Sequence, residues 1–293
     1  MRSVLRWMTD KSVMASRYYF GLRLFLRKRR WLIRSAQIVR AWWILGPLSA
    51  HAVRYYQRRK HDQLIQEDRR DLFPGLEVDH VVNSLNKKGY ANGVNVPAIY
   101  VTEIVRYCEK TALKEYWNPH QECDAIDHIA RNAKIVEIAR RYLGAEPILW
   151  LTLLRWSFGA VAQGPKLVPS RYKEPLLYDE NSFHYDTLDF KSLTLFIYLT
   201  DVDPSSGPHV VVEGTHVSKN FVDLCHIVLT DGAAREKFGD RAKVILGQEG
   251  MMLFEDTSCW HKASHCQTKR LLLSIDYVLQ RRPPPTRMVA AVT

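Results

Sequence analysis

The stretch 181–187 reads Asn-Ser-Phe-His-Tyr-Asp-Thr and places a histidine two positions before an aspartate. Side chains two positions apart on a β-strand point to the same face, so His184 and Asp186 can reach one metal ion from a single strand. A second histidine, His261, follows much further along the chain. Two histidines and one carboxylate occupy one face of an octahedral Fe(II) and leave the opposite positions open, as in non-haem iron oxygenases.

Several apolar runs around these residues predict strands, because β-branched and aromatic residues are frequent in them. A first strand is expected at 147–158, and the others are 191–202, 209–216, 250–256 and 269–279. The segment 203–208, Asp-Pro-Ser-Ser-Gly-Pro, has the composition of a turn. The chain is therefore expected to be α+β with a β-dominated core that carries the candidate ligands on separate strands.

Apolar periodicity predicts helices ahead of this core. We expect helices at 78–88, 98–112 and 129–143, with Gly144 as the C-cap of the last one. The segment 161–180 mixes glycine, proline and charged residues, which is typical of a loop, and we expect it to help cover a substrate.

The segments that carry the candidate ligands resemble a known family. His184, GPHVVVEGTH (207–216), EGMMLFEDTSCWH (249–261) and RLLLSIDY (270–277) are together similar to the phytanoyl-CoA dioxygenase-like family. The resemblance covers roughly residues 145–280. It implies a double-stranded β-helix (jelly-roll or cupin-like) barrel buttressed by helices. It also implies a dioxygenase that uses Fe(II), 2-oxoglutarate and O2.

The resemblance assigns roles to four residues. It implies His184, Asp186 and His261 as the iron ligands. It implies Arg270 as the partner of the distal carboxylate of 2-oxoglutarate, which suits a guanidinium that is always charged and binds carboxylates through two hydrogen bonds. Relatives with a small residue at the carboxylate position bind a halide there. The carboxylate of Asp186 therefore implies hydroxylation, or a related oxidation of an unactivated C–H bond, and not halogenation.

Strand geometry adds candidates for contact with the co-substrate. Alternate residues of the last strand share one face, namely Arg270, Leu272, Ser274 and Asp276. Many relatives have a hydroxyl two positions after the arginine, but Leu272 stands there, so Ser274 is the nearest hydroxyl on the correct face. Thr194 and Tyr198 are the other candidates. Each of these three would equally serve as an ordinary barrel residue.

Other interpretations of the same segment remain open. His265 could replace His261, but it lies only five positions before Arg270 and leaves less chain for one strand to end and the next to begin. Cys259 and Cys266 could join these histidines in a zinc cluster, although their spacing differs from that of structural zinc sites. Two other classes of function are a barrel that binds a ligand without turnover and a cupin-like metal-dependent hydrolase or isomerase.

Charge divides the chain of 293 residues, whose formal net charge is +11. Residues 1–60 contain 15 Lys and Arg and one acid, a net charge of +14, and the rest contains 27 basic and 30 acidic residues. This asymmetry predicts two functional parts. We divide the chain into a basic helical extension, a mixed helical support region, the catalytic core and a mobile tail, at 1–60, 61–144, 145–280 and 281–293.

The extension is predicted to be helical and amphipathic. Arginines recur at helical spacing at 23, 27, 30 and 34, and apolar residues follow another face at 25, 32, 36, 39 and 43. Such a helix can lie on an anionic membrane, pack on the barrel or on a second subunit, or act as an organelle transit peptide. The longest uncharged run, 41–53, is shorter than the roughly 20 residues that a membrane span needs.

The remaining features bound location and partners. Five scattered cysteines suit reduced thiols in a cytoplasmic compartment, which also favours ferrous iron. The charge alone would suit nucleic acid, but no recognition motif is present, so none is expected as a partner. We expect a cytoplasmic enzyme, with a membrane surface as a further contact, that acts on a small-molecule or lipid-like substrate. The sequence selects no particular substrate or oligomeric state.

Overall fold

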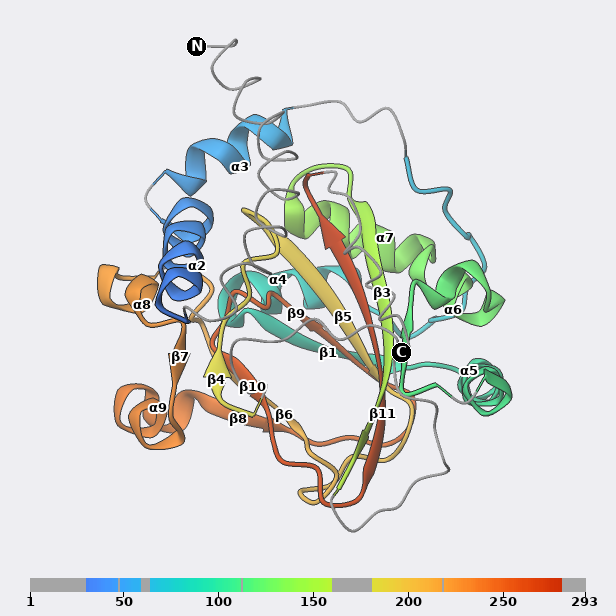
Figure 1. Cartoon of the computed structure of the whole chain (residues 1–293). Coiled ribbons are helices and arrows are strands. Elements are labelled where there is room, and N and C mark those ends of the chain that lie inside the picture. The colour runs from blue at the N-terminus through green and yellow to red at the C-terminus, as the bar shows by residue number, and fades with distance from the viewer. Residues whose placement is uncertain are drawn as a thin grey trace, which may run out of the picture.

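The computed structural model describes residues 30–46, 48–58, 64–111, 113–159, 181–217 and 219–280. These residues form two antiparallel sheets with helices around them (Figure 1). The large sheet has the strand order β1-β9-β5-β11-β3-β2, and the small sheet has the order β7-β4-β10-β6-β8. The predicted combination of helices and antiparallel sheet is confirmed, whereas closure into a double-stranded β-helix and the four-part division of the chain stay predictions.

The strands differ widely in length between the two sheets. The large sheet consists of β1 (Tyr90–Asn95), β2 (Glu115–Trp117), β3 (Ile148–Phe158), β5 (Ser192–Tyr198), β9 (Met251–Glu255) and β11 (Lys269–Val278). The small sheet consists of β4 (Phe183–His184), β6 (His209–Val212), β7 (Val228–Leu229), β8 (Ala242–Ile245) and β10 (His261–Ala263). The long strands thus provide a rigid frame, and the short strands carry the two candidate histidine ligands.

The helices fall into two groups (Figure 1). The first group packs on the large sheet and consists of α4 (Val78–Lys88), α5 (Ala98–Thr111), α6 (Asp124–Ala130) and α7 (Ala133–Leu143). The second group lies towards the small sheet and consists of α2 (Arg30–Leu45), α8 (Phe221–Cys225) and α9 (Asp231–Phe238). Helix α3 (Ser49–Gln57) follows α2 but packs with the first group, because Tyr56 is buried in its cluster and Gln57 Nε2 donates to Leu143 O of α7 at 2.7 Å. Short 3-10 turns occur at Pro119–Gln121 and Gly239–Arg241. No helix among the described residues is both long enough and apolar enough to cross a membrane.

Strand β11 shows how the large sheet separates core from pocket. Leu271, Leu273, Ile275 and Tyr277 are fully buried in the cluster that also contains the inner faces of α4 to α7. The intervening residues, from Arg270 to Asp276, line a pocket on the other side. The predicted shared face of this strand is therefore present. One face stabilises the fold, and the other is available for chemistry.

Two predicted elements differ from the structure. The helix expected at 129–143 is broken into α6 and α7, because Asn132 caps α7 by accepting a hydrogen bond from the Lys134 amide at 3.1 Å. Gly144 ends α7 with a φ of +73°, as expected. The strand expected at 209–216 ends at Val212, where a turn begins that contains Gly214 at a φ of +72°.

The predicted extension and several loops lie only partly within the described residues. The arginines at 23 and 27, the whole of the segment 161–180 and the tail 281–293 fall outside them. Helix α2 is described and buries Ala41 and Ile44, the first of them in a cluster with α8. The described part of the extension therefore packs on the body of the protein.

Replacing Gly89 by alanine should destabilise the protein by about 2 kcal/mol or more. Gly89 ends α4 with a φ of +83°, and a Cβ there would lie 2.3 Å from Cys259 Sγ and 2.6 Å from His216 Nδ1. Left-handed strain adds to the overlap with these side chains. Gly144→Ala is a matched control, because it ends α7 in the same conformation and would meet only the Gln57 side chain. Urea unfolding should show the larger loss for Gly89→Ala, and equal losses would contradict this account.

Candidate metal centre

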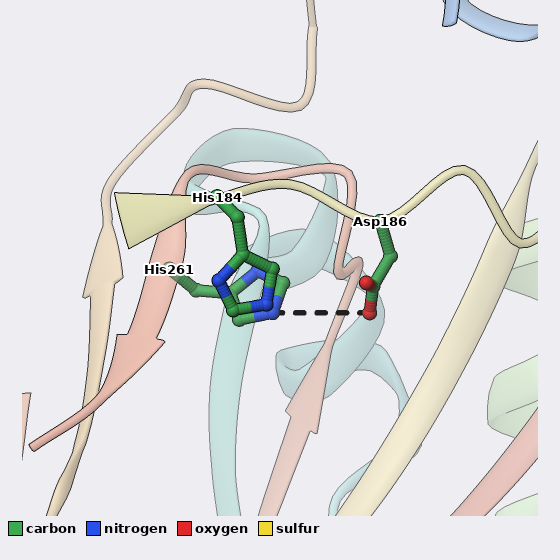
Figure 2. A group of neighbouring side chains, drawn as sticks. All are labelled: His184, Asp186 and His261. Carbon is green, nitrogen blue, oxygen red and sulfur yellow. Dashed lines mark ion pairs between the residues drawn. The ribbon is translucent and has the colours of Figure 1, made fainter. Parts of the chain in front are cut away.

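Three side chains converge at the inner face of the small sheet (Figure 2). One ligand atom from each of His184, Asp186 and His261 lies within 4.8 Å of the others. His261 Nε2 is 3.8 Å from Asp186 Oδ2, and the two imidazole centroids are 4.4 Å apart. His184 and His261 face each other directly across β4 and β10, so the sheet register sets their separation.

Asp186 reaches this site by a different route from the one predicted. Strand β4 ends at His184, so Asp186 lies in the loop that follows and does not share a strand with the histidine. Its backbone amide donates to Thr257 O at 2.8 Å, which ties the loop to the segment ahead of β10. This hydrogen bond fixes the backbone of Asp186, although the residue is outside the strand pairing of β4 with β10.

Both histidines have Nδ1 engaged by a backbone carbonyl. His184 Nδ1 is 2.9 Å from Ser182 O, and His261 Nδ1 is 3.0 Å from Cys259 O. A carbonyl only accepts, so each Nδ1 carries a proton and Nε2 is the nitrogen left for a metal, as contacts behind the ligands of metal sites usually arrange. Burial, and then repulsion by His184, lowers the pKa of His261 to about 4. His261 is therefore neutral near pH 7, the form that binds metal.

Two other assignments, His265 as the distal ligand and a zinc cluster with Cys259 and Cys266, are not supported by the positions of these residues. His265 is exposed, and the set with ligand atoms close together contains His261 instead. Cys259 is buried beside Gly89, whereas Cys266 contacts Ser157 O. Among the described residues, His184, Asp186 and His261 form the one group of this kind that could hold a metal ion.

The three candidate ligands open into a pocket of about 230 Å³ between the two sheets. Its lining comes from β3, β5 and β11 of the large sheet and from β4, β6 and β10 of the small sheet. Arg270 lines it, is 6% exposed, and donates from Nη1 to Gly207 O. A buried guanidinium and a metal-ligand set thus share one cavity, which suits a ligand with a carboxylate at its far end.

The three hydroxyl candidates lie in different places. Thr194 and Ser274 line the pocket. The Thr194 hydroxyl donates to Asp276 Oδ1 at 2.6 Å, and Ser274 Oγ lies 3.5 Å from Leu153 O. Tyr198 is outside the set of described residues that line the pocket, and its hydroxyl donates to Ile245 O at 2.9 Å. Ser274 and Thr194 therefore stay candidates for co-substrate contact, and the arrangement gives Tyr198 no such contact.

Sequence reasoning missed a buried pair behind the candidate ligands. His209 Nε2 lies 2.6 Å from Glu255 Oε2, and the His209 ring stacks on His261 with centroids 5.4 Å apart. Burial raises the pKa of Glu255 to about 8 and lowers that of His209 to about 3, so both are neutral at pH 7. Finding this pair required the strand register, which sets His209 opposite Ala263.

The contribution of Asp276 to the stability of the metal-free protein should fall as the pH rises from about 5 to about 7. Burial raises the pKa of the Asp276 carboxyl from 3.8 to about 7. Above about pH 4 the unfolded chain loses this proton while the folded protein keeps it, so the free energy of unfolding decreases by up to about 1.4 kcal/mol per pH unit. In urea unfolding, Asp276→Asn should remove this negative contribution and make the dependence of stability on pH more positive than in the wild type, whereas the exposed control Asp240→Asn should not. An unchanged slope in Asp276→Asn would refute the assignment.

Comparison with known proteins gives structural neighbours only. No family model matches the sequence, and neither does any curated protein. The solved structure of the non-haem α-ketoglutarate-dependent epimerase SnoN from nogalamycin biosynthesis matches 68% of this chain and 82% of its own, with a TM-score of 0.51 and 14% identity. EctD from S. alaskensis with 2-oxoglutarate and 5-hydroxyectoine matches 79% and 92%, with a TM-score of 0.50 and 14% identity.

A second SnoN structure, in complex with Fe3+, α-ketoglutarate and nogalamycin RO, has a TM-score of 0.50 over the same shares, 68% and 82%, at 14% identity. At such identity these likenesses concern the fold. The chain has the fold of SnoN and EctD, and membership of the phytanoyl-CoA dioxygenase-like family stays a prediction from its sequence.

Proposed function

We propose that this protein is an Fe(II)- and 2-oxoglutarate-dependent oxidoreductase that oxidises an unactivated C–H bond of a small-molecule or lipid-like substrate. The observation that carries the proposal is the convergence of His184, Asp186 and His261 on a pocket that also contains Arg270. The folds of SnoN and EctD, whose structures contain α-ketoglutarate or 2-oxoglutarate, support it.

The donor set fits iron. Two neutral imidazole nitrogens and one carboxylate oxygen form the facial set that non-haem Fe(II) takes, with other positions left for co-substrate and oxygen. When bound, iron and 2-oxoglutarate supply the oxidising chemistry with O2. The protein orients both histidines through Ser182 O and Cys259 O, which engage Nδ1 and leave Nε2 for the metal.

Arg270 is proposed to orient the co-substrate. Its guanidinium is buried in the same pocket and is fixed by donation to Gly207 O. An ion pair in such a dry site is directional, because two parallel N–H groups can meet both oxygens of a carboxylate. Arg155 also lines the pocket, but its Nε lies 3.1 Å from Glu115 Oε1, and this carboxylate partly neutralises its charge.

Hydroxylation is the proposed outcome, and stereochemical inversion is the second candidate. Asp186 is proposed to supply the carboxylate ligand of the metal, so that position is not left open for a halide. Inversion is included because SnoN, a structural neighbour, is described as an α-ketoglutarate-dependent epimerase. Isotopic analysis of the product under 18O2 would separate the two, because hydroxylation carries the label into the product.

Anaerobic addition of Fe(II) and then 2-oxoglutarate should produce a weak visible metal-to-ligand absorption band. The band reports direct binding of the co-substrate to the metal, and the His184→Ala variant should lack it. Slow decarboxylation of 2-oxoglutarate under oxygen would reject both a non-catalytic barrel and a metal-dependent hydrolase. If iron binds but the band is absent, the assignment of 2-oxoglutarate as co-substrate is wrong, and the hydrolase interpretation is favoured.

A further inference from the structure

Two neighbouring helices leave apolar side chains in solvent. Helix α2 and helix α8 lie side by side (Figure 1), and their buried residues share one cluster through Ala41 and Leu224. Exposed apolar residues on these two helices form what we call the α2–α8 patch, which consists of Val39, Trp42, Phe221 and Val222, between 42% and 71% exposed. Exposed apolar groups gathered in this way commonly mark a contact surface.

A cavity of about 220 Å³ lies beside this patch, under the turn between α2 and α3. We call it the lysine pocket, because Lys191 and Lys219 line it together with Asp256 and, from the turn, Leu45 and Ser49. Leu45, which lines it, is the last residue of α2, and Val217, which also lines it, lies four positions before α8. The polar cavity therefore adjoins both helices of the α2–α8 patch.

The lysine pocket carries more positive than negative charge. Lys219 Nζ donates to Thr215 O and Ser258 O, and Lys191 Nζ donates to Tyr142 O. Burial lowers the pKa of both lysines, that of Lys219 to about 8, which still leaves Lys219 mostly protonated near pH 7. Carbonyl oxygens accept without neutralising this charge, and each amino group keeps a further N–H for a ligand.

Asp256 is the single carboxylate among the described residues of the lysine pocket. It already accepts from the Tyr142 hydroxyl at 2.6 Å and from the Ser258 amide at 2.9 Å. Two ammonium groups therefore share one carboxylate, and a second anion would complete the neutralisation of this half-enclosed site.

We propose that the α2–α8 patch and the lysine pocket together bind an anionic phospholipid at a membrane surface. The phosphate lies in the lysine pocket, and the patch enters the interface, where tryptophan and phenylalanine are favoured. The net charge of +14 on residues 1–60 attracts the same anionic surface. This docking does not depend on the proposed catalytic function.

Docking would bring the membrane close to the candidate metal centre. Arg40 of α2 donates from Nη2 to Thr187 O at 3.0 Å, and Thr187 directly follows Asp186. The lysine pocket approaches from another side, since Asp256 and Ser258 flank Thr257, which lines the metal pocket. A lipid at this surface would therefore adjoin the loops that hold the candidate ligands.

Flotation of the metal-free full chain with vesicles tests the proposal. The protein should bind vesicles of phosphatidylcholine and phosphatidylglycerol and should bind pure phosphatidylcholine vesicles much less. A Phe221→Ser, Val222→Ser variant should lose at least about tenfold in binding, because two apolar side chains leave the interface. Lys191→Gln should reduce the preference for anionic vesicles. Lys243→Gln and Val244→Ser, on the exposed part of β8, are matched controls that should bind normally.

Three results would overturn the proposal. Binding of Lys191→Gln with an unreduced preference for anionic vesicles would remove the lysine pocket from it. Absence of flotation together with thermal stabilisation by inorganic phosphate would identify a site for a free anion instead. Absence of flotation together with a dimer that Phe221→Ser disrupts would identify an interface between two copies. Circular dichroism of each variant verifies that it is folded, and the Phe221 substitution remains informative because this side chain is exposed.

Discussion

His184→Ala and Asp186→Ala should each remove stable Fe(II) binding and with it all 2-oxoglutarate turnover. Each change leaves two of the three converging ligand atoms. Loss of a partner that only supports a ligand already costs about 10- to 100-fold in metal affinity or activity, so loss of a ligand should cost more than roughly 100-fold. Metal analysis after gel filtration, together with an assay for succinate, measures both effects.

His265→Ala is the matched control for these variants, because it removes an exposed imidazole from the same segment. It should retain iron and activity, whereas His261→Ala should behave like the two variants above. Full activity in Asp186→Ala would overturn the ligand set, and loss of iron in His265→Ala would reassign the distal ligand.

Arg270→Ala should raise the concentration of 2-oxoglutarate needed for turnover by at least roughly 30-fold while iron still binds. Truncating one partner of a buried charged pair costs about 2 kcal/mol or more, and about 1.4 kcal/mol corresponds to tenfold. The side chain is 6% exposed, so water does not readily replace it. Calorimetric titration of the iron-loaded protein with 2-oxoglutarate under anaerobic conditions measures the effect directly.

Two other cations near the pocket provide controls for Arg270. Lys269 is exposed and precedes it on β11, and Arg155 lines the pocket on the neighbouring strand beside Glu115. Lys269→Ala should leave co-substrate affinity unchanged. If Arg270→Ala binds normally and Arg155→Ala does not, the anchor is on β3 and the assignment taken from the family resemblance is incorrect.

Local pattern was sufficient for the elements that carry the candidate site. Alternating residues of β11 predicted which side chains face the pocket, and the apolar runs predicted β3 and β9 nearly to their ends, whereas β5 ends at Tyr198, four residues earlier than expected. These features depend on periodicity within a strand, which one sequence contains. The candidate ligand set came from the family resemblance, because strand spacing does not account for Asp186, which lies in a loop.

Features that depend on contacts between distant strands could not be predicted. The proximity of His209 and Glu255 arises from the pairing of β6 with β10 and of β9 with β5, and neither residue has a motif of its own. The end of β4 at His184 is decided by its partners β7 and β10. Likewise, Asn132, whose side chain caps α7 at the break after α6, is also held by donation to Arg70 O, far away in sequence.

The brevity of β4 links two properties that are usually measured separately. It consists of Phe183 and His184 alone, and its partner in β10 is the other histidine of the candidate site. A metal ion held by both would act as a cross-link between segments far apart in the chain, and it would stabilise the folded state in proportion to its occupancy. The ordering of this part of the small sheet and the binding of the metal would then be coupled, so that a change in one changes the other. A substitution that merely loosens β4 will therefore resemble the loss of a ligand.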